Sequence, residues 1–359
     1  MRKIITGAIT VLLVLAMVAV LVAGCGTAAQ GTAKAAAPST PQDILNNAVS
    51  AATPMPNATG TFDLNVTVNG DQTKMPAETK AMLAQPITIS GTMSASEKPM
   101  AADIAIKASL AGQQIPVGFR ITGGKAWIQF MGTWYEAPAE LMTAMSAAST
   151  TSSTDQAALL QQLKAAGFDP STWITGLTTV GEEQVDGVKA YHLSGTVDMA
   201  KLVANGMKLS QDKSLQSLIP GMSSLGGTDT SVSLPSGTEL STIENEIGTM
   251  FKNITIDMWI SKDGYQMRKA TLSAQIVPPA SQDAQGITDI TIKATITMTP
   301  AKDAVTVAAP TGAKPWSDLQ QALGGLEQMF GGALGGTTDT SVPEATDTTV
   351  PAATDTTVQ

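Results

Sequence analysis

Long stretches of the chain alternate apolar and polar side chains with a period of two. From Thr59 onward, Phe62, Leu64, Val66 and Val68 fall on one side of an extended backbone and polar residues fall on the other. This alternation predicts a half-buried β-strand. It returns in four further segments, which are 87–93, 104–108, 117–121 and 126–130. Because the segments follow one another closely, we predict a meander of antiparallel strands.

Short turns separate several of these segments. Thr122-Gly123-Gly124-Lys125 lies between two of them, Met131-Gly132-Thr133 follows the second, and Asp186-Gly187 is the strongest hairpin signal in the chain. The later strands are predicted at 178–184, 188–197, 254–260, 266–276, 287–298 and 305–308. The whole chain should therefore contain roughly ten or eleven strands.

Helical spacing appears at the start of this region and in two insertions. Thr40 can cap a helix whose first residue is Pro41, and Ile44, Leu45, Ala48, Val49 and Ala52 form its apolar stripe. The insertions are predicted at 137–166, as two short helices, and at 199–250. We expect segments 141–166 and 199–250 to act as mobile lids.

The N-terminus has the three-part layout of a secretory signal. Arg2 and Lys3 precede an apolar run at 4–22, and Leu21-Val22-Ala23-Gly24-Cys25 matches a bacterial lipobox. We predict a signal peptide at 1–24, with Cys25 carrying a diacylglyceryl anchor at the extracytoplasmic face of the cell membrane. The alternative is a simple spanning anchor with an incidental cysteine, but the run is at the short limit for a span.

Composition changes again at both ends of the strand-rich region. Residues 26–39 are mostly Ala, Thr, Gly and Gln with little to bury, which predicts a lipidated flexible tether at 25–39. The domain should occupy 40–312, followed by a short helical Gly-rich segment at 313–336. An eight-residue Thr/Asp/Val/Pro repeat fills 337–359, where we expect a disordered, solvated tail, or as a variant a wall-spanning or O-glycosylated stalk.

Charge and chemistry exclude several classes of function. Without Arg2 and Lys3, 19 basic residues face 30 acidic ones, a net charge of −11, so we expect no nucleic-acid partner. With Cys25 as the only cysteine and His192 as the only histidine, neither a disulfide nor a multi-histidine metal site is available, and we predict no cofactor, no metal and no enzyme. His192 should be a hydrogen-bonded strand side chain. A glycosidase-like carboxylate pair is the remaining catalytic option.

Several segments together resemble one family, and the likeness spans about Pro41 to Pro310. Members of the LppX/LprAFG family of actinobacterial lipoproteins, which share the LolA-like fold, are similar in four pieces. These are 44–48 (ILNNA), 132–135 (GTWY), 185–195 (VDGVKAYHLSG) and 256–260 (IDMWI). The resemblance implies an α+β, mainly β fold, in which a curved antiparallel sheet forms an incomplete barrel with helices over its concave face. It also implies a lipid or glycolipid ligand moved within the envelope, and therefore a possible envelope transport partner.

An apolar concave face that does not close must be covered by helices, or by helices and a guest. An acyl chain is the natural guest, and we predict a cavity lined by Phe62, Leu64, Val66, Ile104, Ile106, Phe119, Ile121, Trp127, Leu193, Ile256, Met258 and Leu272. Trp134, Tyr135 and Trp259 could line this cavity or belong to the core, and Met side chains on the helices could do either. The alternative function is an envelope protein-binding or sensor module whose core is filled and carries no lipid.

Overall fold

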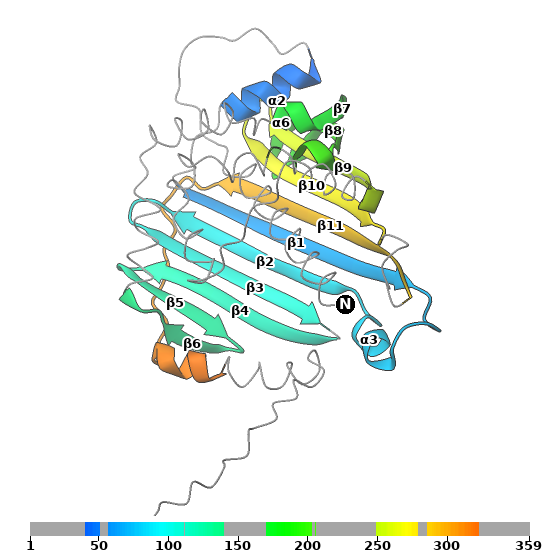
Figure 1. The fold of residues 1–359 in the computed structure, drawn as a ribbon. Helices are drawn as coiled ribbons and strands as arrows, with labels where there is room; N and C mark the ends of the chain where they lie inside the picture. The colour runs from blue at the N-terminus through cyan, green and yellow to red at the C-terminus, as the bar shows by residue number, and fades with distance from the viewer. Residues whose placement is uncertain are drawn as a thin grey trace, which may run out of the picture. The chain divides into compact units, whose positions relative to one another are not determined.

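Eleven antiparallel strands form one sheet in the computed structural model, which describes residues 40–50, 57–110, 112–139, 170–202, 205, 249–278 and 286–322 (Figure 1). The first six strands are β1 (Asn57–Gly70), β2 (Ile87–Ser96), β3 (Ala101–Leu110), β4 (Gln113–Thr122), β5 (Lys125–Phe130) and β6 (Thr133–Glu136). The other five are β7 (Ile174–Val185), β8 (Val188–Val197), β9 (Phe251–Ser261), β10 (Met267–Ile276) and β11 (Ile287–Pro300).

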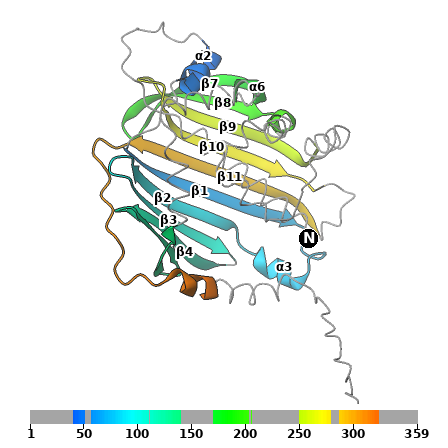
Figure 2. The ribbon, with the colours of Figure 1, turned by 60° about the vertical axis from the view of Figure 1, so that its left-hand side comes forward.

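The strand order is β6-β5-β4-β3-β2-β1-β11-β10-β9-β8-β7. Two meanders, one from each half of the chain, are therefore joined through their first and last strands, and β6 and β7 are the two edges. The sheet twists and bends without joining these edges (Figures 1 and 2). The predicted fold class, a mainly β chain built on an open, curved antiparallel sheet, is confirmed.

Three hairpins have two-residue loops in the left-handed backbone region, and in the loop between β5 and β6 Met131 and Gly132 have φ values of 48° and 85°. Gly123 and Gly124 have φ values of 57° and 74°, and Asp186 and Gly187 have φ values of 48° and 77°. Two successive positive φ angles define the type I′ turn, whose twist matches that of the flanking strands. The hairpins predicted at these two positions are confirmed.

The centre of the sheet is a pairing that no local pattern predicts. β1 lies antiparallel to β11 along its whole length, from Ala58 opposite Pro300 to Gly70 opposite Ile287. This pairing joins the two meanders and gives β1 a neighbour on each side, since β2 occupies its other edge. Residues about 230 positions apart in the sequence are in this way brought into one layer.

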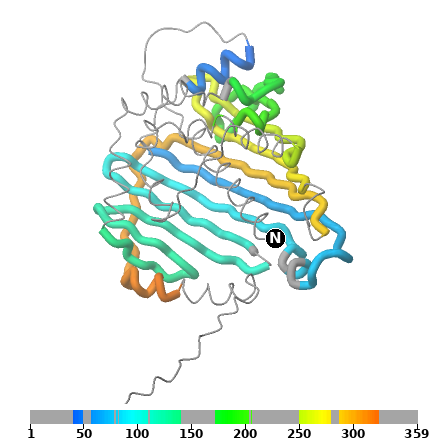
Figure 3. Tube along the Cα trace, viewed as in Figure 1, coloured from blue at the N-terminus to red at the C-terminus, as the bar shows by residue number. Residues whose placement is uncertain are grey.

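Helix α2 (Pro41–Ser50) begins with a reciprocal cap. The Asp43 backbone N–H donates to Thr40 Oγ1 at 3.1 Å, and the Thr40 N–H donates to Asp43 Oδ2 at 3.1 Å. Ile44 and Leu45 are 4% and 2% exposed and belong to the main apolar cluster of the sheet. The helix contacts β7, β9 and the short helix α6 (Pro170–Trp173). In Figure 3 its blue trace lies next to the green and yellow segments. The helix predicted at this position is confirmed.

The remaining helical predictions lie mostly outside the described residues. The small helix α3 (Ala77–Met82) follows β1, and a helix is described at 316–322, within the predicted segment 313–336. Segments 141–166 and 206–248, which include most of both predicted lids, lie outside the described residues, as do residues 1–39 and the repeat tail. Within the described ranges, none of the helices has the length and apolar character needed to span a bilayer.

The strand predicted at 305–308 is wrong. These residues keep an alternating exposure, with Val305 and Val307 half-buried, but they form no ladder. Both edges of β1 are occupied, so no strand edge is free next to the end of β11. The chain instead runs in extended form to the β6 edge, where the Lys314 N–H donates to the Trp134 carbonyl at 2.8 Å. Alternation of apolar and polar residues indicates an extended chain. To form a strand, that chain also needs a neighbouring strand whose backbone N–H and C=O groups are unpaired.

Candidate functional site

One face of the sheet is apolar across nine strands, and we call it the apolar face. Residues directly opposite one another in an antiparallel pair share a face. Following these partners from β5 to β8 gives an unbroken row of apolar residues and one glycine: Phe130, Val117, Ile106, Gly91, Phe62, Ile296, Ala270, Met258 and Leu193. Polar side chains, by contrast, predominate on the other face of the same strands.

Eleven of the twelve residues predicted to line a cavity lie on this face. The pairings place them there across both meanders: Phe62, Leu64, Val66, Ile104, Ile106, Phe119, Ile121, Leu193, Ile256, Met258 and Leu272. The structure therefore gathers into one surface residues that are spread over more than two hundred positions of the chain.

The apolar face is filled at one end and half-open at the other. Over β8, β9 and β11, Leu193, Met258 and Ile292 are at most 1% exposed. Over β1 and β3, Leu64 and Ile106 are only half-buried, and most apolar positions on β2 and β4 are similar. Most apolar side chains over β8–β11 are thus buried, and most of those over β1–β4 keep part of their surface exposed.

A glycine shapes the floor of the half-open part. Gly91 lies opposite Phe62, and a Cβ atom added to Gly91 would collide with the Phe62 ring and with the carbonyl oxygen of Ala105. The Phe62 ring therefore occupies the space next to the α-carbon of Gly91.

Trp127 lies on the other side of the sheet from the remaining predicted residues. It is opposite Arg120, whereas Ala126 is opposite Ile121 on the apolar face. The structure thus separates Trp127 from the predicted lining because neighbouring residues of a strand point in opposite directions. Its ring is 5% exposed.

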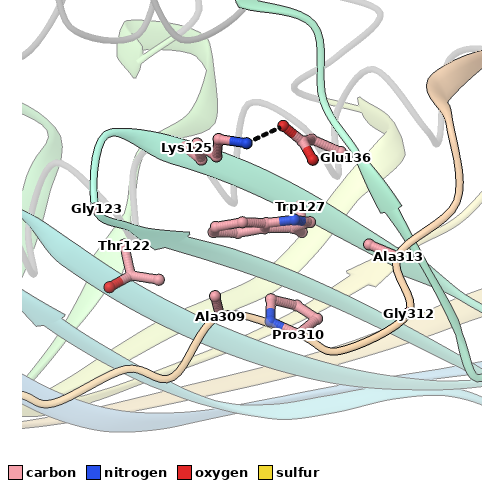
Figure 4. A pocket seen from close by; sticks show the side chains of 9 residues that line it. All are labelled: Thr122, Gly123, Lys125, Trp127, Glu136, Ala309, Pro310, Gly312 and Ala313. Carbon is pink, nitrogen blue, oxygen red and sulfur yellow. Dashed lines mark hydrogen bonds and ion pairs between the residues drawn. The ribbon is translucent and has the colours of Figure 1, made fainter.

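Trp127 instead helps to line a pocket of about 530 Å³ on this second face (Figure 4). The extended chain at 309–313 forms one wall, with Ala309 and Pro310 close to the tryptophan ring. Lys125 Nζ and Glu136 Oε1 form an ion pair at 2.7 Å on the opposite side of the ring. The two charged groups satisfy each other.

A polar cluster surrounds His192 on the second face of β7, β8 and β9. His192 Nδ1 lies 2.8 Å from Glu183 Oε1, and Nε2 lies 3.3 Å from Asp257 Oδ1. The imidazole stacks on Trp259 with ring centroids 4.2 Å apart, and Lys269 Nζ lies 4.3 Å from the centroid of the indole. His192 is a hydrogen-bonded strand residue, as predicted.

Trp259 completes this cluster, and it is not on the apolar face. Its Nε1–H donates to Glu183 Oε2 at 2.8 Å, and only 8% of the residue is exposed. This hydrogen bond, followed by the one with His192, lowers the pKa of the Glu183 carboxyl below its ordinary value. The cluster pins β7, an edge strand, to β9 across β8.

The described residues offer little for metal or nucleophilic chemistry. No group of three or more His, Cys, Asp or Glu within them is arranged to hold a metal ion. The two carboxylates beside His192 approach different ring nitrogens, so they do not converge on one point. Cys25, the predicted lipidation site, lies outside the described residues.

Sequence reasoning missed Arg268, a buried cation at the start of β10. The residue is 8% exposed, and burial lowers the pKa of its guanidinium. It occupies an irregularity in the pairing of β10 with β9, where Met267 is opposite Ile260 and Lys269 is opposite Trp259. Such a bulge has no reliable sequence signal, so the sequence alone predicts that Arg268 is a strand residue exposed to solvent.

Comparisons with known proteins place the chain near one described family and several solved structures. The family described as "Family of unknown function (DUF6612)" matches residues 40–170. A search of curated proteins finds no match.

The chain is similar to the lipoprotein LppX of Mycobacterium tuberculosis, with a TM-score of 0.30 and 12% identity over 75% of this chain and 98% of that one. LprF of Mycobacterium bovis gives a TM-score of 0.29 and 13% identity over 76% and 97% of the two chains. A LolA superfamily protein from Nitrosomonas europaea gives a TM-score of 0.19 and 9% identity over 76% and 96%.

Proposed function

We propose that this chain is a membrane-anchored extracytoplasmic lipoprotein that binds a lipid or glycolipid on its apolar face and carries it within the cell envelope. The observation that supports this most directly is the half-open part of that face over β1–β4. Its apolar side chains, among them Phe62, Leu64 and Ile106, remain partly exposed although they adjoin a fully buried core.

The energetics of lipid transfer explain why such a surface is useful. A lipid with two acyl chains exposes more than about thirty methylenes to water, at roughly 0.8 kcal/mol each, when it leaves a bilayer. Unaided transfer is therefore extremely slow. An apolar sheet that accepts the chains removes most of this barrier without a nucleophile or a metal.

An anchor on the same molecule keeps the binding face close to its source of lipid. We propose that Cys25 carries this anchor and that the tether at 25–39 gives the domain its reach. Two or more acyl chains on one cysteine hold a protein firmly, whereas a single chain binds only marginally. A transport partner in the envelope would receive the cargo.

Native mass spectrometry tests this proposal. The full acylated lipoprotein is purified from its own host in a neutral detergent, and its mass is measured under native and denaturing conditions. We expect a non-covalent adduct with the mass of one lipid, which is lost on denaturation and recovered by organic extraction. The covalent anchor remains in both spectra and so does not interfere.

A pair of neighbouring substitutions provides the matched control. Leu64→Gln places an amide on the apolar face, and Asp63→Gln places the same amide on the other face of β1. Lipid occupancy should fall in the first variant and stay unchanged in the second. A protein that carries no lipid, with a face closed by its own side chains, would contradict the proposal and favour a protein-binding or sensor module.

A further inference from the structure

Arg268 is a buried positive charge at the start of β10, between two residues of the apolar cluster, Met267 and Ala270. On β10, Lys269 lies over Trp259 on the second face, while Ala270 belongs to the apolar cluster. Met267 also belongs to that cluster and pairs with Ile260. Arg268 is therefore the extra residue of the bulge, and it follows the alternation of Ala270 toward the apolar side. Because it is the second residue of β10, it lies where the sheet ends.

The guanidinium lacks the partners that a buried cation needs. Within the described part of the chain, Arg268 Nε and Nη1 are buried and have no hydrogen-bond acceptor. The carboxylate of Asp186 acts on this charge, but no ion pair joins the two described residues, and Asp186 accepts a hydrogen bond from Thr299 Oγ1 at 2.7 Å. Arginine stays protonated in proteins, so the unpaired charge is costly and favours an anion brought by a ligand.

We propose that Arg268 binds the anionic head group of the lipid, a phosphate or carboxylate at the rim, while the acyl chains lie along the apolar face. This inference rests on the proposed function and names the class of lipid that it requires. A few polar groups at the mouth of an apolar site fix the orientation of a ligand, and a guanidinium suits an oxyanion through charge-assisted hydrogen bonds. Neutral lipids with the same chains should bind more weakly.

The test compares two lipids that differ only in the head group. The full lipoprotein in neutral detergent is titrated with dioleoyl phosphatidic acid and with dioleoylglycerol whose chains carry bromine, and quenching of tryptophan fluorescence reports binding. We expect the unaltered protein to bind the phosphatidic acid at least about tenfold more tightly, as charge-assisted hydrogen bonds allow. Arg268→Gln should remove this preference and leave dioleoylglycerol binding intact.

A neighbouring charge supplies the control. Lys269→Gln removes the same charge from the adjacent residue on the opposite face, and its preference for the anionic lipid should remain. If Arg268→Gln keeps the preference, or if the unaltered protein binds both lipids equally, this inference is overturned while the proposed function stands. If neither lipid binds, the proposed function fails and this inference fails with it.

Melting temperatures give a second readout that does not depend on the glutamine variant folding well. Arg268→Met should melt above the unaltered protein without lipid, because an unpaired buried charge has been removed, and below it with saturating phosphatidic acid. The absence of this crossover would contradict the inference. Inorganic phosphate alone should leave the melting temperature of the unaltered protein unchanged, and a rise as large as that with phosphatidic acid would assign the site to a free anion.

Discussion

Two leucine-to-alanine substitutions distinguish the filled half of the apolar face from the half-open part. Leu193 on β8 is 0% exposed and packs within the main cluster, whereas Leu64 on β1 is half-buried. Leu193→Ala should lower the free energy of unfolding by about 3 kcal/mol, within the range of 2–5 kcal/mol for buried leucines. Leu64→Ala, which loses less contact, should cost only about 1 kcal/mol.

Lipid affinity should respond in the opposite order. If the acyl chain covers Leu64, its truncation removes about 1 kcal/mol of contact with the ligand, which weakens binding about fivefold. Leu193→Ala should leave the affinity nearly unchanged, because its side chain is enclosed by protein.

Urea unfolding followed by tryptophan fluorescence measures the first quantity, and quenching by brominated lipid measures the second. Equal losses of stability in the two variants, together with unchanged lipid affinity in Leu64→Ala, would refute the division of the face into a core and a binding surface. Leu193→Ala is the internal control for a general loss of folding.

Three further changes test local features of the fold. The hydrogen bond from Trp259 lowers the pKa of the Glu183 carboxyl in the folded state, so its ionised form stabilises the fold, and this stability is lost as the pH falls below about 4.5. Glu183→Gln should therefore lose less stability than the unaltered protein over this pH range. Thermal melts from pH 7 to pH 3 measure the difference. Thr40→Ala should cost about 1 kcal/mol by removing the helix cap, measured by urea unfolding. Gly91→Ala should displace the Phe62 ring and cost about 1–3 kcal/mol, as overpacking does, with a changed lipid affinity.

Each of these changes has a control that removes a similar group without the same interaction. Glu182→Gln removes a carboxylate paired with Lys262 and should keep the steep dependence that Glu183 confers. Thr40→Ser retains a capping hydroxyl and should retain stability. Gly181 on β7 has no other atom within 4 Å of a Cβ added to it, so Gly181→Ala should leave Phe62 and lipid affinity unaffected.

Local chemistry made much of the fold predictable from the sequence. The Thr40-Pro41 start of α2 and the Asp186-Gly187 turn depend on hydrogen bonds and φ angles within a few residues, and the structure contains both. The prediction of a strand at 305–308 was wrong, because the alternation of apolar and polar residues does not indicate whether the edge of a neighbouring strand is free. The pairing of β1 with β11 was likewise beyond local reasoning, since it joins residues far apart in the chain.

In the candidate site, too, some features were predictable from the local sequence and others depended on how the strands pair. Eleven of the twelve residues named for the lining share one face, because period two is a property of each strand by itself. Trp127 falls on the second face, because it follows Ala126, which lies opposite Ile121 on the apolar face. Arg268 depends on a bulge, where one extra residue changes the direction of a side chain, so only the paired strands show that the cation is buried.

Photo-cross-linking with a lipid that carries a diazirine in its acyl chain tests the central claim most directly. The full lipoprotein is loaded with the probe, irradiated and digested, and the labelled residues are identified by mass spectrometry. The account predicts labels on the apolar face of β1–β4, at residues such as Leu64, Ile106 and Phe119, and none at Asp63 or Lys107, which point the other way. Labels spread evenly over both faces, or absent from β1–β4, would contradict it.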